Sequence, residues 1–174
     1  MLITPEYAAL NRQLHATSDT YGTSGHKWAD QVFSLAQQCG ALSVLDYGAG
    51  KCTLGKVLFA KYGRLPFEFI EYDPAVPEKE HKPGQVDMVV CGDVLEHIEP
   101  DCLYAVLDDI RSIARKAVFL MVATQPAAKF LADGRNAHLI VEPIEWWLPK
   151  LMLRWRVKLL RDFGGQFMLV GAPK

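Results

Sequence analysis

The stretch Val44–Leu54 constrains the fold most, because a short strand, a tight turn and the start of a helix fit within it. Residues 43–47 are mainly apolar, which predicts a buried strand. Gly48 and Gly50 let the backbone turn sharply and approach a ligand without an intervening Cβ. Thr53 is placed to cap the following helix. A strand that enters a helix through a glycine loop predicts an open α/β sheet with a ligand at the carboxyl ends of its strands.

The residues of this loop argue against two common phosphate-bearing ligands. A dinucleotide loop, G-x-G-x-x-G, needs a third glycine where this chain has Thr53. A phosphate-binding loop fits from Gly50 to Lys56, but the next residue is Val57, which has no hydroxyl for a magnesium ion. The carboxylate of Asp46 would also repel a pyrophosphate. The loop therefore favours a ligand that carries positive charge and no phosphate.

The segment Asp46–Cys52 resembles the first motif of the Rossmann-like (class I) methyltransferases that use S-adenosylmethionine (SAM). That motif has an acid followed by glycines at three alternate positions, and Cys52 stands where the third glycine usually lies. The resemblance implies that Asp46, Gly48, Ala49 and Gly50 lie against SAM, which carries a sulfonium and an ammonium group. The alternative is a tight strand-to-helix turn that binds nothing.

A second acidic position follows the next expected strand, 66–73. Asp73 lies 23 residues after Gly50, close to the spacing at which dinucleotide folds place the acid that binds ribose hydroxyls. It also matches the second acidic motif of the methyltransferase pattern, so the resemblance gives it the ribose of SAM. The alternative is an Asp-Pro turn. The proline-rich, charged segment 74–85 predicts a loop where the family has a helix and a strand, so no residue is assigned to the adenine pocket.

The expected buried strand 86–91 leads into Gly92–Ile98, which resembles the fourth-strand motif of small-molecule methyltransferases. The resemblance places Asp93 on the SAM side of the active site. Glu96 and His97 carry groups that could bind a metal ion, together with the acids at positions 99 and 101. The sequence offers no evident second group of ligands for them, so we expect no metal site.

The N-terminal part of the chain combines a weak helix, 5–15, with the polar, glycine-containing segment 17–25. This segment is either a linker or a lid, because the family often closes the segment before the first core helix over SAM. Tyr21 and Trp28 would be the contacts of such a lid. The pattern of residues 27–38 predicts an amphipathic helix behind it.

Strands and helices alternate from residue 43 to residue 123, which predicts a doubly wound, mostly parallel sheet with a shortened crossover after its second strand. Two apolar segments, 155–163 and 166–171, are joined across a Gly-Gly pair and predict an antiparallel C-terminal hairpin. Basic residues gather at positions 150–161. We interpret them as a solvated strand face, with a patch for an anionic substrate as the alternative.

The long polar loop 124–136 is expected to line the methyl acceptor, since loops of this length beside a ligand site are usually functional. His138 follows it and is our first candidate for a general base, and Asp93 is the second. A histidine that is only packed or exposed is the alternative for His138. The acceptor is expected to be a small molecule, a lipid-like molecule or a protein side chain.

Length and composition agree with a single methyltransferase-like domain over residues 1–174. The 174 residues carry a formal net charge of −1, which argues against bulk nucleic-acid binding. We expect a lid and first helix in 1–40, a SAM-binding core in 41–124 and an acceptor side in 125–174. The four cysteines lack a zinc-binding spacing, and we expect reduced thiols in the cytoplasm. No signal peptide or membrane-spanning run is evident.

These observations predict a SAM-dependent methyltransferase that transfers a methyl group by in-line displacement at the sulfonium. The rival interpretation is a domain with the same fold that binds SAM or a partner protein and has lost the chemistry. A shortened crossover at 74–85 and Cys52 in place of glycine are what favour that rival. The sequence leaves the acceptor and the oligomeric state open.

Overall fold

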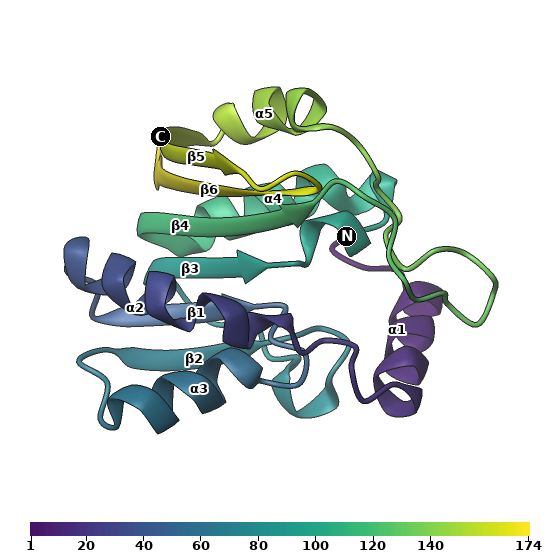
Figure 1. Cartoon of the computed structure of the whole chain (residues 1–174), viewed down its shortest axis with the longest axis horizontal. Helices are drawn as coiled ribbons and strands as arrows, with labels where there is room; N and C mark the ends of the chain where they lie inside the picture. The colour runs from purple at the N-terminus through teal and green to yellow at the C-terminus, as the bar shows by residue number, and fades with distance from the viewer.

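The computed structural model describes residues 1–174, which form one sheet with helices on both faces (Figure 1). The strands are β1 (Ser43–Tyr47), β2 (Glu68–Tyr72), β3 (Val86–Gly92), β4 (Ala114–Ala123), β5 (Trp155–Asp162) and β6 (Gln166–Pro173). The α-helices are α1 (Pro5–Thr17), α2 (Ala29–Gln38), α3 (Thr53–Tyr62), α4 (Leu103–Ile113) and α5 (Ile144–Met152). Short 3-10 helices are η1 (Ser24–Trp28), η2 (Pro77–Lys79), η3 (Leu95–His97) and η4 (Pro100–Cys102).

The six strands lie in the order β2-β1-β3-β4-β6-β5. β1 pairs in parallel with β2 and β3, and β3 pairs in parallel with β4. β6 lies antiparallel between β4 and β5, so the expected C-terminal hairpin is present. The segment 74–85 contains only the short turn η2 between β2 and β3. The predicted fold class is therefore confirmed, including the shortened crossover.

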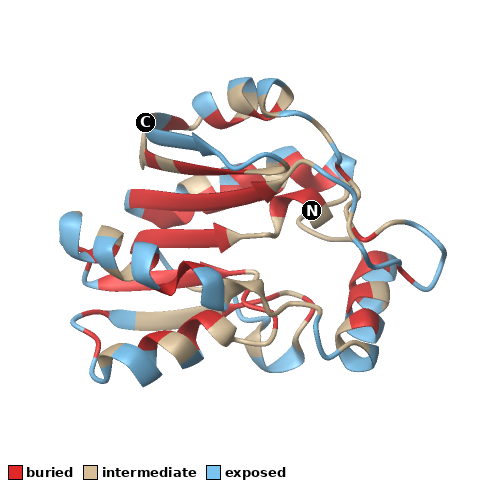
Figure 2. Ribbon diagram, in the orientation of Figure 1, coloured by how far each residue is buried: buried red, intermediate tan, exposed pale blue.

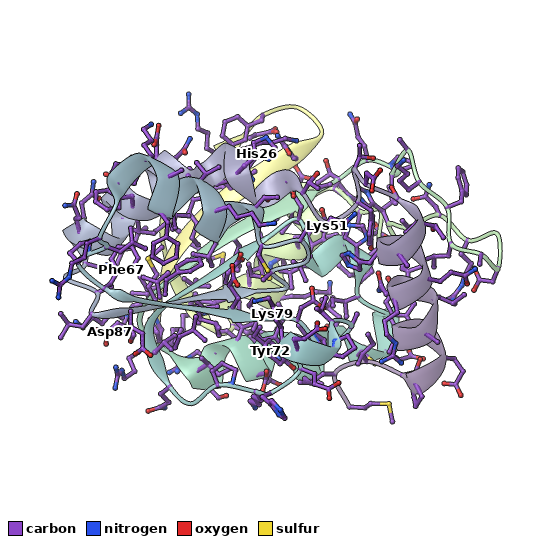
Figure 3. The ribbon with its side chains drawn as sticks, turned by 90° about the horizontal axis from the view of Figure 1, so that it is seen from below. His26, Lys51, Phe67, Tyr72, Lys79 and Asp87 are labelled. Atoms are coloured by element: carbon purple, nitrogen blue, oxygen red, sulfur yellow. The ribbon has the colours of Figure 1, made fainter.

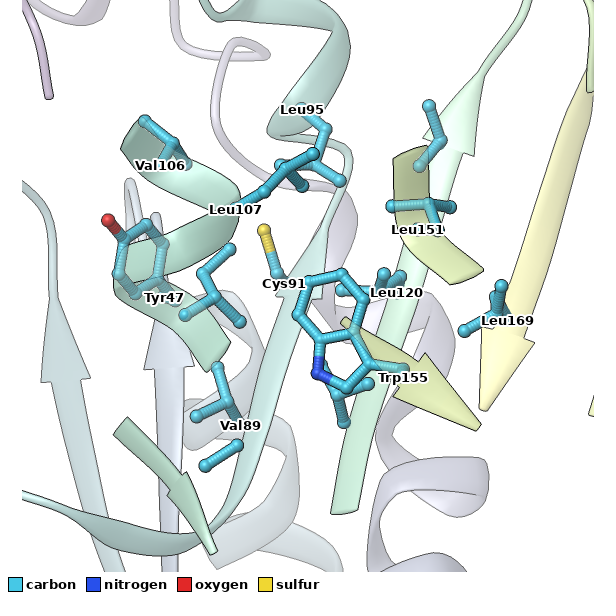
Figure 4. Packing of buried hydrophobic residues seen from close by; sticks show 14 of the residues in the cluster. Tyr47, Val89, Cys91, Leu95, Val106, Leu107, Leu120, Leu151, Trp155 and Leu169 are labelled. Atoms are coloured by element: carbon cyan, nitrogen blue, oxygen red, sulfur yellow. The ribbon is translucent and has the colours of Figure 1, made fainter. Parts of the chain in front are cut away.

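Buried side chains on the central strands alternate between two cores, as the period of a strand requires. On β4, Leu120 packs in a core with Leu107 of α4 and Leu151 of α5 (Figure 4). Phe119, the neighbouring residue, packs in the other core with side chains of α2 and α3, among them Leu58. β1, β3 and most of β4 are buried between these layers (Figure 2). This sandwich fixes the carboxyl ends of β1 and β3 next to each other.

The start of α3 differs from the sequence-based expectation, because Thr53 does not cap the helix. Cys52 is the N-cap residue, has a φ of 59° and makes no side-chain cap. The Thr53 hydroxyl instead donates to the carbonyl of Thr23 at 2.8 Å and accepts from the His26 amide at 3.3 Å. The hydroxyl thus fastens the segment before α2 to the glycine loop. Cys52 adopts the left-handed conformation that glycine would occupy without strain, which explains why glycine is usual at this position.

Helix α1 and the loop 124–143 lie at the carboxyl end of the parallel strands (Figure 1). Thr4 begins α1 by accepting from the Tyr7 amide at 3.2 Å. Its amide and hydroxyl donate to the Glu99 carboxylate at 2.8 and 2.7 Å. The Tyr7 hydroxyl donates to the carbonyl of His97 at 2.5 Å. These bonds hold α1 across the segment that follows β3.

One edge of the sheet is the strand β5, which pairs with β6 alone. The register of this pair shifts between Val157 and Leu159. The side chains of Arg156, Lys158 and Arg161 are exposed along this strand, which agrees with the interpretation of the basic residues as a solvated face. No helix of the structure combines the length and the apolar character that spanning a membrane requires.

Candidate functional site

A cavity of about 490 Å³ opens where β1 and β3 end. Segments that are far apart in the sequence form its wall: α1 and the following segment 20–27, the loops after β1, β2 and β3, and the segment 126–138. Predicted site residues that line it are Tyr21, Gly48, Gly50, Asp73, Asp93 and His138. The long polar loop thus faces the glycine loop across one space.

The two glycines of the loop are required first by contacts within the protein. Gly48 has a φ of +83°, and a Cβ there would lie 2.4 Å from Cγ2 of Val94. Gly50 has a φ of +48°, and a Cβ there would lie 2.9 Å from the carbonyl oxygen of Gly22. That carbonyl accepts from the amide of Lys51 at 2.9 Å. Figure 3 shows the position of Lys51 in the molecule. The segment before α2 therefore packs directly on the glycine loop.

Asp73 connects the loops after β1 and β2. Its Oδ2 accepts from the Gly50 amide and its Oδ1 from the Ala75 amide, both at 2.9 Å. The side chain is buried and borders the cavity. A carboxylate has about four lone-pair positions, so each oxygen can accept one further hydrogen bond. Asp73 can therefore hold the loop and bind a hydroxyl pair at the same time.

Three other predicted cofactor residues do not border this cavity. Asp46, Ala49 and Trp28 line a separate, smaller cavity of about 30 Å³, and Gly48 and Asp93 lie between the two. Burial raises the pKa of Asp46 to about 7, and the nearby negative charges of two acids add to the effect. Asp46 is therefore partly protonated near neutral pH, which weakens the expected attraction for a cation.

Asp93 borders both cavities and has an unusual backbone conformation. Its φ is 56°, the left-handed region that non-glycine residues rarely adopt. Its amide donates to the carbonyl of Met121 on β4 at 3.0 Å. A residue strained in this way at the end of a buried strand is a common feature of ligand sites.

His97 and His138 lie together, with ring centroids 4.7 Å apart. The Nδ1 of His138 is 2.5 Å from the carbonyl oxygen of Gln125, and the Nδ1 of His97 is 2.7 Å from that of Ala137. Because a carbonyl only accepts, each Nδ1 carries the proton and each Nε2 has a free lone pair. Burial lowers the pKa of His97 to about 3, so this imidazole is neutral at physiological pH.

Glu96 lies beside these imidazoles and is fully buried. Its Oε1 accepts from the amide of Ala123 at 3.1 Å, whereas Oε2 has no hydrogen-bond partner. Burial raises the pKa of Glu96 to about 8, and the negative charge of Asp93 contributes. The sequence offered no evident group to complete a metal site with Glu96 and His97. The structure places His138 beside them, because the loop 124–138 folds back over η3.

Helix α1 contributes residues that the sequence analysis did not assign to the site. Tyr7, Asn11 and His15 border the cavity. The hydroxyl of Tyr21 donates to Oδ1 of Asn11 at 2.8 Å and lies 3.3 Å from Nδ1 of His97. The available signal was a polar residue at every fourth position, which places these side chains on one face of a helix.

Searches of family models and of curated proteins find no match to this sequence. Several solved structures with similar folds are methyltransferases. The chain is 16% identical to 1,6-didemethyltoxoflavin-N1-methyltransferase from Burkholderia thailandensis, with a TM-score of 0.62, over 100% of this chain and 92% of that chain. That structure holds 1,6-didemethyltoxoflavin and S-adenosylhomocysteine.

Two further structures give similar results. The methyltransferase domain of bacterial CtHen1 is 15% identical, with a TM-score of 0.63, over 85% of this chain and 97% of that chain. Magnesium protoporphyrin IX methyltransferase from Synechocystis PCC 6803, with S-adenosylhomocysteine bound, is 14% identical, with a TM-score of 0.56, over 95% and 94%. The chain therefore has the Rossmann-like fold of the class I methyltransferases, as the sequence predicted.

Proposed function

We propose that this chain is a SAM-dependent methyltransferase that acts on a small-molecule acceptor. The observation that carries the proposal is a single cavity whose wall includes Asp73 and the glycine loop together with Asp93 and His138. Its volume of about 490 Å³ lies within the range of roughly 300–1,000 Å³ for small-molecule sites. Proteins of the same fold have been crystallised with S-adenosylhomocysteine.

The residues at the glycine end fit SAM. Asp73 lines the cavity and has lone pairs left to accept from the ribose hydroxyls, and Gly48 and Gly50 present backbone without side chains. Tyr21, on the segment above, would close over the bound molecule. Trp28 and Asp46 line the smaller cavity. They would support the wall of the main cavity without contacting a molecule bound in it. SAM, when bound, supplies a methyl group on a sulfonium that a nucleophile can displace in line.

The residues at the other end would hold the acceptor. His138 presents a free Nε2 and can take up the proton that the acceptor loses on attack. Asp93 lies between the two ends and can orient the acceptor or share this role. Residues of helix α1 and of the loop 124–138 line this space and would limit the access of water to it. Alignment of the nucleophile and the methyl group in such an enclosed site accounts for much of the acceleration of a bimolecular transfer.

A second candidate function is SAM binding without transfer. The loop at 74–85 favours it, because the structure has no helix and strand there to build an adenine pocket. Calorimetry of the purified chain with SAM, S-adenosylhomocysteine, NAD and ATP tests both candidates. We expect micromolar binding of SAM, and binding of NAD or ATP without SAM would refute the cofactor assignment.

His138→Ala separates the enzyme from the binding domain. We expect methyl transfer to fall by roughly 10²- to 10⁴-fold, as for loss of a general base, while SAM affinity changes little. An acceptor is found first by a screen of small molecules with labelled SAM. His81→Ala, in the exposed loop 74–85, is the matched control. Equal losses of transfer and of SAM affinity would place His138 in cofactor binding instead.

We also propose a cytoplasmic location, which the four free cysteines fit.

A further inference from the structure

We propose that Glu96, His97 and His138 form a binding site for a divalent transition-metal ion at the acceptor end of the cavity. One potential ligand atom from each residue lies within 4.8 Å of those from the other two. Two imidazoles and one carboxylate are a common ligand set for zinc and other first-row metals, and this set leaves coordination positions open. Bonds near 2.1 Å require ligand separations of about 3.4 Å, so metal binding would draw the ligand atoms together by at most about 1.4 Å.

Both imidazoles make, through Nδ1, the hydrogen bond that metal-bound histidines usually make. In each ring Nδ1 donates to a backbone carbonyl, from Ala137 or from Gln125, and Nε2 is left as the ligand. This arrangement fixes the ring and the tautomer, which is the role of the hydrogen bonds behind a metal-bound histidine. The residues next to His138 in the sequence do not orient its ring, because Gln125 lies 13 residues earlier in the chain.

Oε2 of Glu96 is the second, independent observation. It belongs to a side chain with no exposed surface and has no hydrogen-bond partner. A buried polar atom without a partner is uncommon and destabilises the folded state. A cation beside the imidazoles would give this oxygen a partner. Asp93 adds a second carboxyl group at the same wall.

The three residues come from two segments that are fixed to each other. Glu96 and His97 belong to η3, and the carbonyl of Glu96 accepts from the Ile140 amide at 3.0 Å. His138 is held by its amide, which donates to Oδ1 of Asn136 at 2.9 Å. The candidate ligands are therefore set in position by backbone hydrogen bonds, without a metal ion.

The consequence for the acceptor rests on the proposed function. A metal ion here would bind an acceptor hydroxyl and lower its pKa, so that the O–H proton leaves to water. The oxygen then forms a bond to the methyl carbon as the carbon–sulfur bond breaks, and S-adenosylhomocysteine remains. In this form His138 is a ligand and not a base. The site therefore selects acceptors with an oxygen nucleophile.

Calorimetric titration of the untagged whole chain with Zn²⁺, in the absence of SAM, tests the site directly. We expect one ion per chain with micromolar or tighter affinity. Both His138→Ala and Glu96→Gln should weaken binding at least tenfold, and His81→Ala should not. Co²⁺ should give visible absorption bands in the wild type that His138→Ala abolishes. Circular dichroism of each variant checks that it is folded.

Each result bears on one proposal. Failure of the wild type to bind Zn²⁺ or Co²⁺, or binding that His138→Ala leaves unchanged, would overturn the metal site. A separate titration with SAM tests the cofactor assignment, so SAM binding without metal binding overturns only this inference. Metal binding without SAM binding would overturn only the proposed function. Transfer that a chelator leaves undiminished would overturn the activation of the acceptor by metal.

Discussion

Replacement of Asp73 should affect both the stability of the chain and its affinity for SAM. Its two oxygens each accept from one backbone amide, Gly50 and Ala75, at 2.9 Å. In Asp73→Asn the amide oxygen can keep one of these bonds, while the NH₂ group faces the other donor. Loss of one hydrogen bond to a charged group costs about 1.5–3 kcal/mol. We therefore expect the free energy of unfolding to fall by about that amount in the absence of any ligand.

The same substitution should weaken SAM binding by roughly ten- to a hundredfold, because one acceptor for the ribose hydroxyls is lost and 1.4 kcal/mol corresponds to about tenfold. Asp73→Ala is a poorer test. It removes both amide partners and about 3–6 kcal/mol, a large share of the roughly 5–15 kcal/mol that stabilises a domain.

Urea unfolding and calorimetry with SAM, both at 25 °C, measure the two effects separately. Asp30→Asn is the control, because Asp30 is an exposed acid paired with Lys61 and should change stability little. An unchanged urea midpoint in Asp73→Asn would show that the amide bonds do not stabilise the loop. A lower midpoint with unaltered SAM affinity would place the ribose elsewhere.

Three further predictions concern the walls of the cavity. Gly48→Ala should destabilise the chain by about 1–3 kcal/mol, since its φ of +83° strains any side chain and the new Cβ meets Val94; Gly48→Ala combined with Val94→Ala should recover part of this loss in urea unfolding. Glu96 has a pKa raised to about 8, so the folded state holds its proton more tightly than the unfolded state. The contribution of this proton to the free energy of unfolding is complete below the unfolded pKa and is lost as pH rises through about 8. Glu96→Gln should therefore make unfolding free energy less dependent on pH between about 5 and 8, and equal slopes for the variant and the wild type would contradict the raised pKa. Tyr21→Phe removes the hydrogen bond to Asn11 and should lower the melting temperature by a few degrees, which corresponds to about 1 kcal/mol; no change would mean that this bond is exchanged with water at no cost.

The fold could be predicted because its signals are local. The glycine loop, the apolar strand β3 and the apolar run in β4 each identify their element without reference to the rest of the chain. The crossover at 74–85 was also predictable, since its prolines and charges oppose both a helix and a strand. Hydrophobic periodicity and turn residues thus suffice for a sheet whose strands are buried on both faces.

The partners of polar side chains were not predictable in the same way. Thr53 has the residue type and position of a cap, but its hydroxyl donates to the carbonyl of Thr23, thirty residues earlier. His138 meets Glu96 only because the intervening chain completes β4 and folds back. Such contacts depend on the path of the chain and leave no local pattern.

Asp46 shows a different limit of sequence reasoning. Its position at the end of β1 predicts a ligand contact, but successive side chains of a strand point to opposite faces. Tyr47 therefore borders the main cavity, and Asp46 borders the smaller one. Which of two adjacent residues meets a ligand depends on the layer in which the ligand lies, and only the packed helices determine that layer.

The edge strand β5 has a consequence for the behaviour of the chain at high concentration. An open edge offers unpaired amides and carbonyls to any other extended chain, and a neighbouring copy could add a strand there. The irregularity near Lys158 interrupts this row of groups, and the exposed positive charges of Arg156 and Arg161 repel the same edge of a second molecule. The basic residues of β5 thus protect the protein from edge-to-edge aggregation, a role independent of any ligand.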